Sequence, residues 1–230
     1  MRAMVLAAGR GMRMRPLTDR TPKPLLSVGG EPLIVHHLRS LHAIGVRDVL
    51  INVSWLGEQI REALGDGKRF GMRLVYSPEP EGALETGGGI YRALCWLGQG
   101  PFLVVNGDVW VDGLASWWQA LSTREGDEGG LMLVPTPGWK ARHDFTLVDG
   151  SRVRRGGATV TYAGVACLRA ELFERMDACG FAHQARFPLA PLLFEAARDD
   201  RLSGAMHRKA WSDVGTPERL AEVDAQLSSA

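Results

Sequence analysis

The first 26 residues place an apolar strand directly before a glycine-containing loop that carries several positive charges. Residues 4–8 read Met-Val-Leu-Ala-Ala, and the chain turns at Gly9. Small residues allow backbone N–H groups to approach an anion closely, and arginine and lysine side chains then add charge. The stretch therefore predicts a phosphate-binding site, with a strand-to-helix turn and a solvated basic loop as the alternative. The cations of this stretch are Arg10, Arg13, Arg15 and Lys23.

Two common phosphate-binding motifs do not fit this loop. A P-loop needs Gly-x4-Gly-Lys-Ser/Thr, but Gly9 and Gly11 are too close together and no Lys-Ser/Thr pair follows. A dinucleotide fingerprint needs a third glycine where Met14 stands, and an acidic residue after the second strand, where the chain reads Asn52-Val53-Ser54. The sequence therefore favours neither a P-loop nucleotidase nor a dehydrogenase.

Strand and helix patterns then alternate along the chain. Apolar residues recur at helical spacing over Pro32–Ile44, and a β-branched run of strand length covers Asp48–Val53. A short amphipathic helix is predicted over Leu56–Leu64 and a third strand over Met72–Tyr76. The order strand, helix, strand, helix, strand predicts a parallel sheet with helices on its faces.

The later part of the chain predicts further elements and one excursion. Residues Ala141–Arg155 read as a hairpin that turns at Asp149-Gly150. The charged, glycine-rich segment Thr123–Gly130 predicts a mobile loop, and Trp117 and Trp118 are expected in a packed helix. Strands are predicted over Phe102–Val105, Leu131–Val134 and Thr159–Leu168, and helices over Thr86–Leu97, Leu114–Leu121, Phe187–Ala197 and Pro217–Leu227.

The composition limits the classes of partner. A chain of 230 residues with 45% hydrophobic residues can bury a full core, so we expect one domain. The net charge is +1, from 27 Lys and Arg against 26 Asp and Glu, so no global field attracts nucleic acid or an anionic membrane. The basic cluster of the N-terminal loop is therefore local, which favours a small anionic ligand.

Cysteine usage and hydropathy predict a cytosolic protein. The N-terminus reads as a core strand rather than a signal peptide, and no apolar run approaches about 18 residues. The adjacent His36 and His37 do not share a helix face, so we expect no metal site there. Reduced, mostly buried thiols are expected for the three cysteines, Cys95, Cys167 and Cys179.

Ligands of parallel sheets bind beyond the carboxyl ends of the strands. That rule points to the loop at Gly9, the region near Ser54, the segment Ser77–Gly89 and the end of the strand at Val105. The segment 77–89 contains two prolines and four glycines, so its main-chain groups could read a nucleobase. A surface loop before a helix start is the alternative for this segment.

Two aspartates are candidate metal ligands. The apolar strand from Phe102 ends in Asn106-Gly107-Asp108, and a carboxylate at the tip of a rigid strand suits Mg²⁺ on a triphosphate. A turn-forming Asn-Gly-Asp is the alternative. Asp213 stands shortly before Thr216, which is expected to cap the last helix. Taken alone, Asp213 is typical of a turn before a helix.

The N-terminal loop resembles the motif of the sugar-1-phosphate nucleotidyltransferases. The resemblance continues at residues 84–88, at Gly107-Asp108 and at Asp213. It implies a Rossmann-like three-layer α/β/α fold with a mixed central sheet, in one domain over residues 1–230. The nucleotide-binding half would cover about residues 1–110 and the sugar-binding half about 111–230. The matching runs of the loop are Leu6-Ala7-Ala8-Gly9-x-Gly11-x-Arg13-x-x-Pro16-Leu17-Thr18 and Pro22-Lys23-Pro24-Leu25.

The resemblance also implies roles for the matching residues. Arg13, Lys23 and Asp108 are expected to be catalytic, and Asp108 and Asp213 to hold Mg²⁺. Met12 departs from the family pattern, because many members have a small or polar residue there. The implied nucleotide-binding residues are Ala8, Gly9, Gly11, Met12, Arg13, Lys23, Ala83, Thr86 and Gly87. The implied sugar phosphate-binding residues are Asn106, Asp144, Gly164 and Asp213.

Within the family, the chain resembles most the uridylyltransferases that act on N-acetylmuramate 1-phosphate in bacterial cell-wall recycling. This implies UTP and N-acetylmuramic acid α-1-phosphate as substrates. We expect a monomer, because no added domain for assembly follows the Asp213 helix, and the near-neutral net charge predicts no nucleic-acid or membrane partner. Arg142 or His143 would then meet the lactyl carboxylate of the sugar. Mannose-1-phosphate guanylyltransferase is the alternative substrate assignment, and a non-catalytic sugar-nucleotide sensor is the alternative of another class. The matching segments are Asn52–Gly57, Leu84–Gly89, Val105–Trp110 and Trp211–Thr216.

Overall fold

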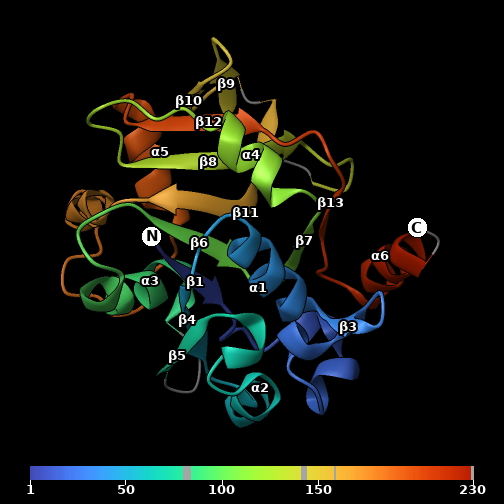
Figure 1. The fold of residues 1–230 in the computed structure, drawn as a ribbon. Coiled ribbons are helices and arrows are strands. Elements are labelled where there is room, and N and C mark those ends of the chain that lie inside the picture. Colours follow the sequence, from blue (N-terminus) through green and yellow to red (C-terminus); the bar gives the residue numbers. More distant parts are fainter. Residues whose placement is uncertain (80–83, 141–143, 158, 229–230) are drawn as a thin grey trace.

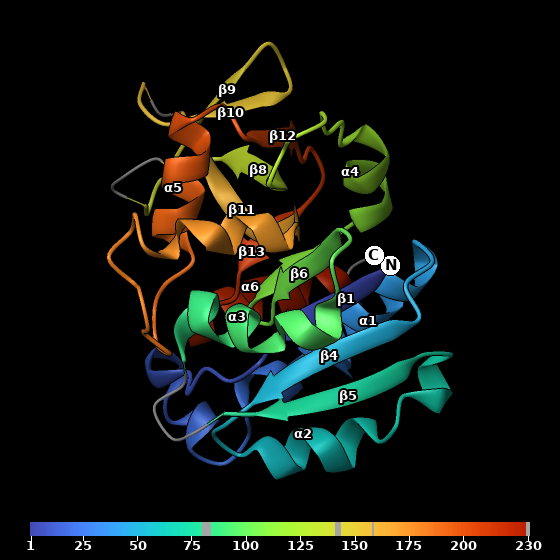
Figure 2. The same ribbon diagram turned by 90° about the vertical axis from the view of Figure 1, so that its left-hand side faces the viewer.

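A mixed sheet of nine described strands forms the centre of the fold (Figure 1). The structure is a computed structural model, and it describes residues 1–79, 84–140, 144–157 and 159–228. β1 (Arg2–Leu6) lies between β4 (Asp48–Val53) and β6 (Phe102–Asn106), and β5 (Arg73–Pro78) pairs with the outer side of β4 (Figure 2). These four strands are parallel, so the chain leaves β1 toward one side and later returns to its other side. Loops diverge at such a switch point and leave room for a ligand.

The rest of the sheet contains both strand directions. β11 (Val160–Leu168) runs antiparallel to β6 and to β8 (Gly129–Pro135), whereas β12 (Leu202–Met206) runs parallel to β8. β10 (Arg152–Arg154) and β9 (Thr146–Val148) form the predicted hairpin at the sheet edge, antiparallel to β12. The mixed central sheet is therefore confirmed. Two small sheets pair β7 (Val109–Val111) with β13 (Trp211–Asp213), and β2 (Ser27–Val28) with β3 (Glu31–Pro32).

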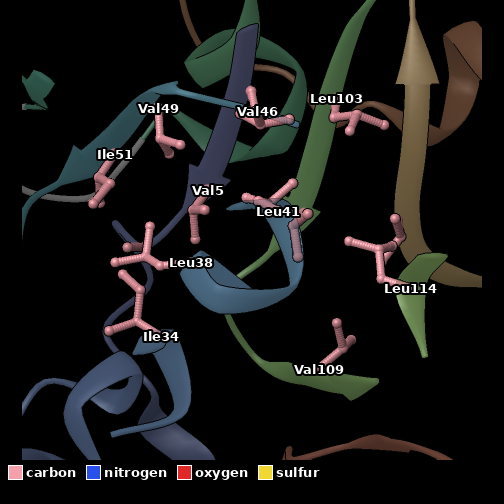
Figure 3. Packing of buried hydrophobic residues seen from close by; sticks show 14 of the residues in the cluster. Val5, Ile34, Leu38, Leu41, Val46, Val49, Ile51, Leu103, Val109 and Leu114 are labelled. Carbon is pink, nitrogen blue, oxygen red and sulfur yellow. The ribbon is translucent and has the colours of Figure 1, made fainter. Parts of the chain in front are cut away.

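Helices cover both faces of the sheet, which gives three layers. Successive strand residues point to opposite faces, so Val5 and Met4 of β1 enter different core clusters. The Val5 cluster is covered by α1 (Leu33–Ala43) and α4 (Leu114–Ala120), with Leu38 and Leu114 packed near Val5 and Leu103 (Figure 3). α2 (Gly57–Leu64) also contributes buried side chains to it. The Met4 cluster is closed by α3 (Glu85–Leu97) and α5 (Ala190–Arg198), and α6 (Pro217–Ser228) packs beside β2. Short 3-10 helices cover Met12–Met14, Leu17–Asp19, Lys23–Leu25, Lys68–Phe70 and Ala170–Met176.

Two predicted elements differ from the structure. The helix predicted from Phe187 begins only at Ala190, because the Phe187 N–H and carbonyl bond to Leu84 and Gly88 instead of starting a helix. The loop predicted over Thr123–Gly130 gives way to β8 at Gly129, and Asp127 within it is buried.

The thiols are less buried than expected. All three cysteines are free, but Cys95 is exposed, Cys167 is buried and Cys179 is half-buried. Burial raises the pKa of the Cys167 thiol to about 11, which keeps it protonated. Within the described ranges, every helix is too short or too polar to cross a membrane.

Candidate active site

A cavity that we call the nucleotide-side cavity lies at the switch point around β1. It has a volume of about 340 Å³ and is lined from the loop after β1 and from the ends of β4 and β6. With the exception of Gly87, every described residue that was predicted to bind the nucleotide lines it. Ala83 lies outside the described residues. The sequence motif and the cavity therefore coincide.

Hydrogen bonds fix the loop that follows β1. The amide oxygen of Asn52 accepts the N–H of Ala7 at 2.7 Å, which ends the strand and starts the loop. Gly11 has φ +67°, and its carbonyl accepts the Thr18 hydroxyl at 2.8 Å. A Cβ atom at Gly11 would lie 2.8 Å from Thr18 Cγ2, whereas one at Gly9 would meet no described heavy atom within 4 Å. Gly11 thus shapes the loop, and Gly9 leaves its backbone open to the cavity.

Two of the four loop cations face this cavity. Lys23 is 8% exposed, and its Nζ lies 3.1 Å from Asp108 Oδ2. Arg13 also lines the cavity, with its guanidinium near Gly215. Arg10 lies instead over the ring of Trp55, and Arg15 pairs with Asp19 at 3.0 Å. The structure therefore selects Arg13 and Lys23 from the basic cluster.

Strand pairing brings Asp108 and Asp213 together. Asp213 of β13 pairs with Val109 of β7, and the N–H of Val214 donates to the Asp108 carbonyl at 2.8 Å. Both aspartates line a smaller cavity of about 210 Å³, which we call the acidic cavity and which adjoins the first one at Arg13, Asn106 and Asp108. Residues 105 positions apart in sequence thus share one site.

The carboxylates of Asp108 and Asp213 suit a metal ion that also binds the phosphates of a substrate. The described residues contain no group of three or more His, Cys, Asp or Glu side chains that could hold a metal ion alone. Two carboxylates are hard oxygen ligands, and Mg²⁺ normally completes its shell with waters and substrate phosphates. Asp108 and Asp213 therefore suit a divalent cation that arrives with a triphosphate.

The predicted sugar-side residues lie around the acidic cavity in two ways. Asn106 and Gly164 line it directly, and Gly164 has φ +83° at an irregularity of β11. A Cβ atom at Gly164 would lie 3.0 Å from Asn106 Nδ2, so only glycine fits there. Asp144 is engaged differently: its carboxylate accepts the Lys140 ammonium at 2.5 Å and the Tyr162 N–H at 3.0 Å. Arg142 and His143 lie outside the described residues.

Thr86 and Gly87 serve the start of α3 in different ways. The Thr86 hydroxyl lines the nucleotide-side cavity and accepts the Leu189 N–H at 3.0 Å. A Cβ atom at Gly87 would lie 2.5 Å from ring carbons of Phe187, which fills the space beside it. Packing against Phe187 therefore explains this glycine without a ligand.

The family model described as nucleotidyl transferase matches residues 2–145. The chain belongs to the nucleotidyltransferase family. It is 49% identical to the N-acetylmuramate alpha-1-phosphate uridylyltransferase of Neisseria meningitidis, over 98% of this chain and 97% of that protein. The protein of the same name from Caulobacter vibrioides is 36% identical, over 99% of this chain and 97% of its own length.

A solved structure shares the fold of this nucleotidyltransferase. A crystal structure from Bacillus anthracis, of a protein assigned as a glucose-1-phosphate thymidylyltransferase, matches with a TM-score of 0.87. The match covers 100% of this chain and 96% of that one at 18% identity, so it bears on the fold alone. The predicted three-layer fold of the family is confirmed.

Several site residues of this nucleotidyltransferase escaped the sequence prediction. Asn52 and Glu79 form a buried pair, with Asn52 Nδ2 donating to Glu79 Oε1 at 2.7 Å under the nucleotide-side cavity. The other Glu79 oxygen accepts the Leu84 N–H at 2.8 Å, which positions the start of α3. Asn52 and Glu79 were predicted only as parts of ligand-side segments, Asn52–Gly57 and Ser77–Gly89, without roles of their own.

Tyr162 also lines the acidic cavity. Its hydroxyl is buried and finds no hydrogen-bond partner in the part of the chain that the structure describes. Burial raises its pKa, so the hydroxyl stays protonated. An isolated tyrosine in a strand pattern gives no sequence signal for this position.

Proposed function

We propose that this nucleotidyltransferase transfers the UMP group of UTP to N-acetylmuramic acid α-1-phosphate and releases pyrophosphate. The observation that carries the proposal is the 49% identity to the N-acetylmuramate alpha-1-phosphate uridylyltransferase of Neisseria meningitidis, which extends over nearly the full length of both chains. The two adjoining cavities support it, because one carries the phosphate-binding loop and the other carries the sugar-side residues. The product would be UDP-N-acetylmuramic acid.

The proposed reaction needs no nucleophilic side chain and no general base. An oxygen of the sugar phosphate is already anionic, and it attacks the α-phosphorus in line while the bond to pyrophosphate breaks. Arg13 and Lys23 line the nucleotide-side cavity, where they would orient the triphosphate and offset its charge. When held by Asp108 and Asp213, Mg²⁺ supplies further positive charge to the phosphates.

The acidic cavity would hold the sugar phosphate. Asn106 and the backbone at Gly164 line it and are placed to contact the acceptor. Asp144 would act through Lys140, because its carboxylate holds the Lys140 ammonium at the wall of this cavity.

The presence of Arg13, Lys23, Asp108 and Asp213 at the two cavities favours catalysis over a non-catalytic sensor. A monomer acting in the cytosol, where UTP is available, completes the proposal. Mannose-1-phosphate guanylyltransferase activity is the contrasting outcome of the test below.

The proposal is tested by pyrophosphate release from a crossed panel. The four nucleoside triphosphates are each combined with the 1-phosphates of N-acetylmuramate, glucose, N-acetylglucosamine and mannose. We expect the highest kcat/KM for UTP with N-acetylmuramate 1-phosphate, and no release when EDTA removes the metal. If GTP with mannose 1-phosphate gives the highest value, the substrate assignment is wrong while the reaction type stands.

A further inference from the structure

A third cavity adjoins the acidic cavity on the side away from the nucleotide. This outer cavity has a volume of about 1000 Å³ and shares Trp139, Trp211 and Asp213 with the acidic cavity. Its lining carries the cations Arg208, Lys209 and Arg219 against the carboxylates of Asp213 and Glu222. The proposed reaction assigns no role to this excess of positive charge.

Arg219 holds a fixed place in the outer cavity. Its Nη1 donates to Asp213 Oδ2 at 3.0 Å and to the Asp213 carbonyl at 3.0 Å. The guanidinium also lies over the ring of Trp139, with Cζ 4.2 Å from the ring centroid. Both hydrogen bonds to Asp213 come from Nη1, so the Nη2 and Nε donors are not used in this contact. A planar fork with donors to spare suits a second carboxylate.

The contact with Asp213 competes with the proposed metal. A divalent cation on the Asp213 carboxylate would weaken the attraction of that carboxylate for Arg219, since both interactions draw on the same negative charge. The ring of Trp139 would still hold the guanidinium in the outer cavity. Arg219 would then face an incoming ligand with an unbalanced positive charge.

The position of Arg219 indicates which anion it would meet. The nucleotide-side cavity is lined by Arg13 and Lys23, whereas Arg219 lies beyond Asp213 in the outer cavity. A phosphate that reacts beside Asp108 is therefore served by the first two cations. An anion at Arg219 must belong to the far side of the acceptor sugar, where an acidic sugar carries a carboxylate.

We propose that Arg219 covers Asp213 in the empty enzyme and, once a divalent cation binds there, receives the carboxylate of an acidic sugar 1-phosphate in the outer cavity. The inference rests on the proposed function and adds a residue that selects the acceptor. It couples metal binding to acceptor recognition, because the metal releases the guanidinium that the acceptor needs.

Two further cations lie in the outer cavity, and one of them, Arg208, offers a matched control for Arg219. The Lys209 side chain lies against the turn at Gly113, where a Cβ atom would be 2.5 Å from Lys209 Cδ. Arg208 is exposed at the rim of the outer cavity. Arg208→Gln therefore removes the same charge from the same cavity without touching the contact with Asp213.

The test compares acceptors with and without the carboxylate, which are N-acetylmuramate 1-phosphate and N-acetylglucosamine 1-phosphate. For Arg219→Gln we expect kcat/KM to fall roughly 10- to 100-fold with the acidic acceptor, the scale of a lost hydrogen bond to a charged group, and to change little with the neutral one. Arg219→Lys, which keeps the charge but not the fork, should recover part of the preference. Arg208→Gln should keep the preference of the wild type.

Metal binding gives a readout that does not depend on turnover. Mn²⁺ titration of the nucleotide-free protein, followed by electron paramagnetic resonance, should show tighter binding in Arg219→Gln, because a competing cation has been removed. Weaker Mn²⁺ binding with equal loss for both acceptors would assign Arg219 to holding Asp213 in place and overturn the inference.

The acceptor comparison can also overturn it. Arg219 would be excluded as the selecting residue if Arg219→Gln kept the wild-type preference for the acidic acceptor. The same would follow if Arg208→Gln lost that preference to the same extent as Arg219→Gln. A wild-type enzyme that does not use N-acetylmuramate 1-phosphate at all would instead contradict the proposed function, so the two failures are distinguishable.

Discussion

At the scale of single residues, the two proposed metal ligands each lie beside a cation of the protein. Lys23 pairs with Asp108 at 3.1 Å, and Arg219 pairs with Asp213 at 3.0 Å. Each of the two carboxylates therefore has a protein countercharge in the absence of a metal ion. When a divalent cation and a triphosphate enter together, the carboxylates and the cations can each exchange a protein partner for a ligand.

The two cations of the nucleotide-side cavity should matter most for the rate. We expect Arg13→Ala and Lys23→Ala each to slow turnover by roughly 10²- to 10³-fold, the usual scale for one preorganised charge partner. Lys23→Arg should restore only part of the rate, because a planar fork and a compact ammonium place their charge differently. Turnover is measured at saturating substrates, and a variant that keeps the wild-type rate would remove its residue from the mechanism.

The two carboxylates should act through the metal. Asp108→Asn and Asp213→Asn each remove an anionic ligand at nearly constant side-chain size. We expect both to lose measurable activity at ordinary Mg²⁺, to keep the wild-type circular dichroism spectrum, and to recover part of the rate at raised Mg²⁺. An Mg²⁺ dependence of Asp213→Asn identical to that of the wild type would place the second ligand elsewhere.

His37 of α1 is a buried titratable group below the site. Burial lowers its pKa from 6.5 to about 4, helped by the charge of His36, while Asp108 and a bond to the Val109 carbonyl oppose the shift. Between these two values the unfolded chain binds more protons than the folded one, so the free energy of unfolding falls as the pH falls from 6.5 toward 4. We expect a loss of about 2 kcal/mol between pH 7.5 and pH 5 from this residue.

The His37 contribution can be separated from the other titrations. Urea unfolding is measured at pH 7.5 and pH 5 for the wild type, for His37→Gln and for His183→Asn on the surface. The His37→Gln variant should lose less stability on acidification than the other two proteins. The same pH dependence in all three would show that His37 does not titrate as inferred.

Sequence patterns predicted part of this site well. Arg13 and Asp108 follow β1 and β6, whose order is readable, so their shared edge of the sheet follows from the parallel arrangement, whereas Lys23 was found through the loop motif. Tyr162 reaches the site through the pairing of β11 with β8, and Arg219 reaches it on α6, which follows β13 after that strand pairs with β7. Such long-range pairing has no local sequence pattern, and neither residue was predicted.

At the scale of elements, the sequence predicted whether a segment is a helix or a strand better than it predicted the residues at which that element begins and ends. The prediction for Asp48–Val53 matches β4 at both ends, because its β-branched run stops where a polar turn begins. The helix predicted from Phe187 starts late because Phe187 bonds to α3 across the fold. A strand or helix pattern shows which residues prefer a conformation, but a distant backbone partner decides where it stops.

Two glycines on ligand-facing elements should separate packing from binding. Gly87→Ala places a Cβ atom 2.5 Å from the Phe187 ring, so we expect it to destabilise the protein by about 1–3 kcal/mol through overpacking. Gly9→Ala has open space in the cavity, so we expect wild-type stability but a raised KM for UTP. Urea unfolding and initial rates check both, and a Gly9→Ala enzyme with unchanged KM would show that UTP does not approach this backbone.

At the scale of the whole molecule, a buried ion pair links strands in the part of the sheet that lies far from the nucleotide-side cavity. Arg152 of β10 donates from Nη1 to Asp127 at 2.8 Å and to Ser203 of β12 at 2.9 Å, and from Nε to Asp200 at 2.9 Å. The Arg152 and Asp127 side chains are only 5% and 3% exposed. The network therefore joins the hairpin to β12 and to the segment before β8. Both halves of the chain contribute strands to one sheet, so we propose that they unfold together as one domain.

Arg152→Met tests this network and the single-domain proposal together. Removing one partner leaves Asp127 buried without its countercharge, so we expect a loss of about 3–5 kcal/mol in the free energy of unfolding. The matched control is Arg154→Met, because Arg154 reaches the same Asp200 at 3.2 Å but is 45% exposed, and it should cost no more than about 1 kcal/mol. Adding Asp127→Asn to Arg152→Met should recover part of the loss, since the unpaired charge is removed.

Far-UV circular dichroism and tryptophan fluorescence should report one coincident urea transition in every variant. Two separate transitions in Arg152→Met would instead show that the sugar-binding half unfolds as a domain of its own.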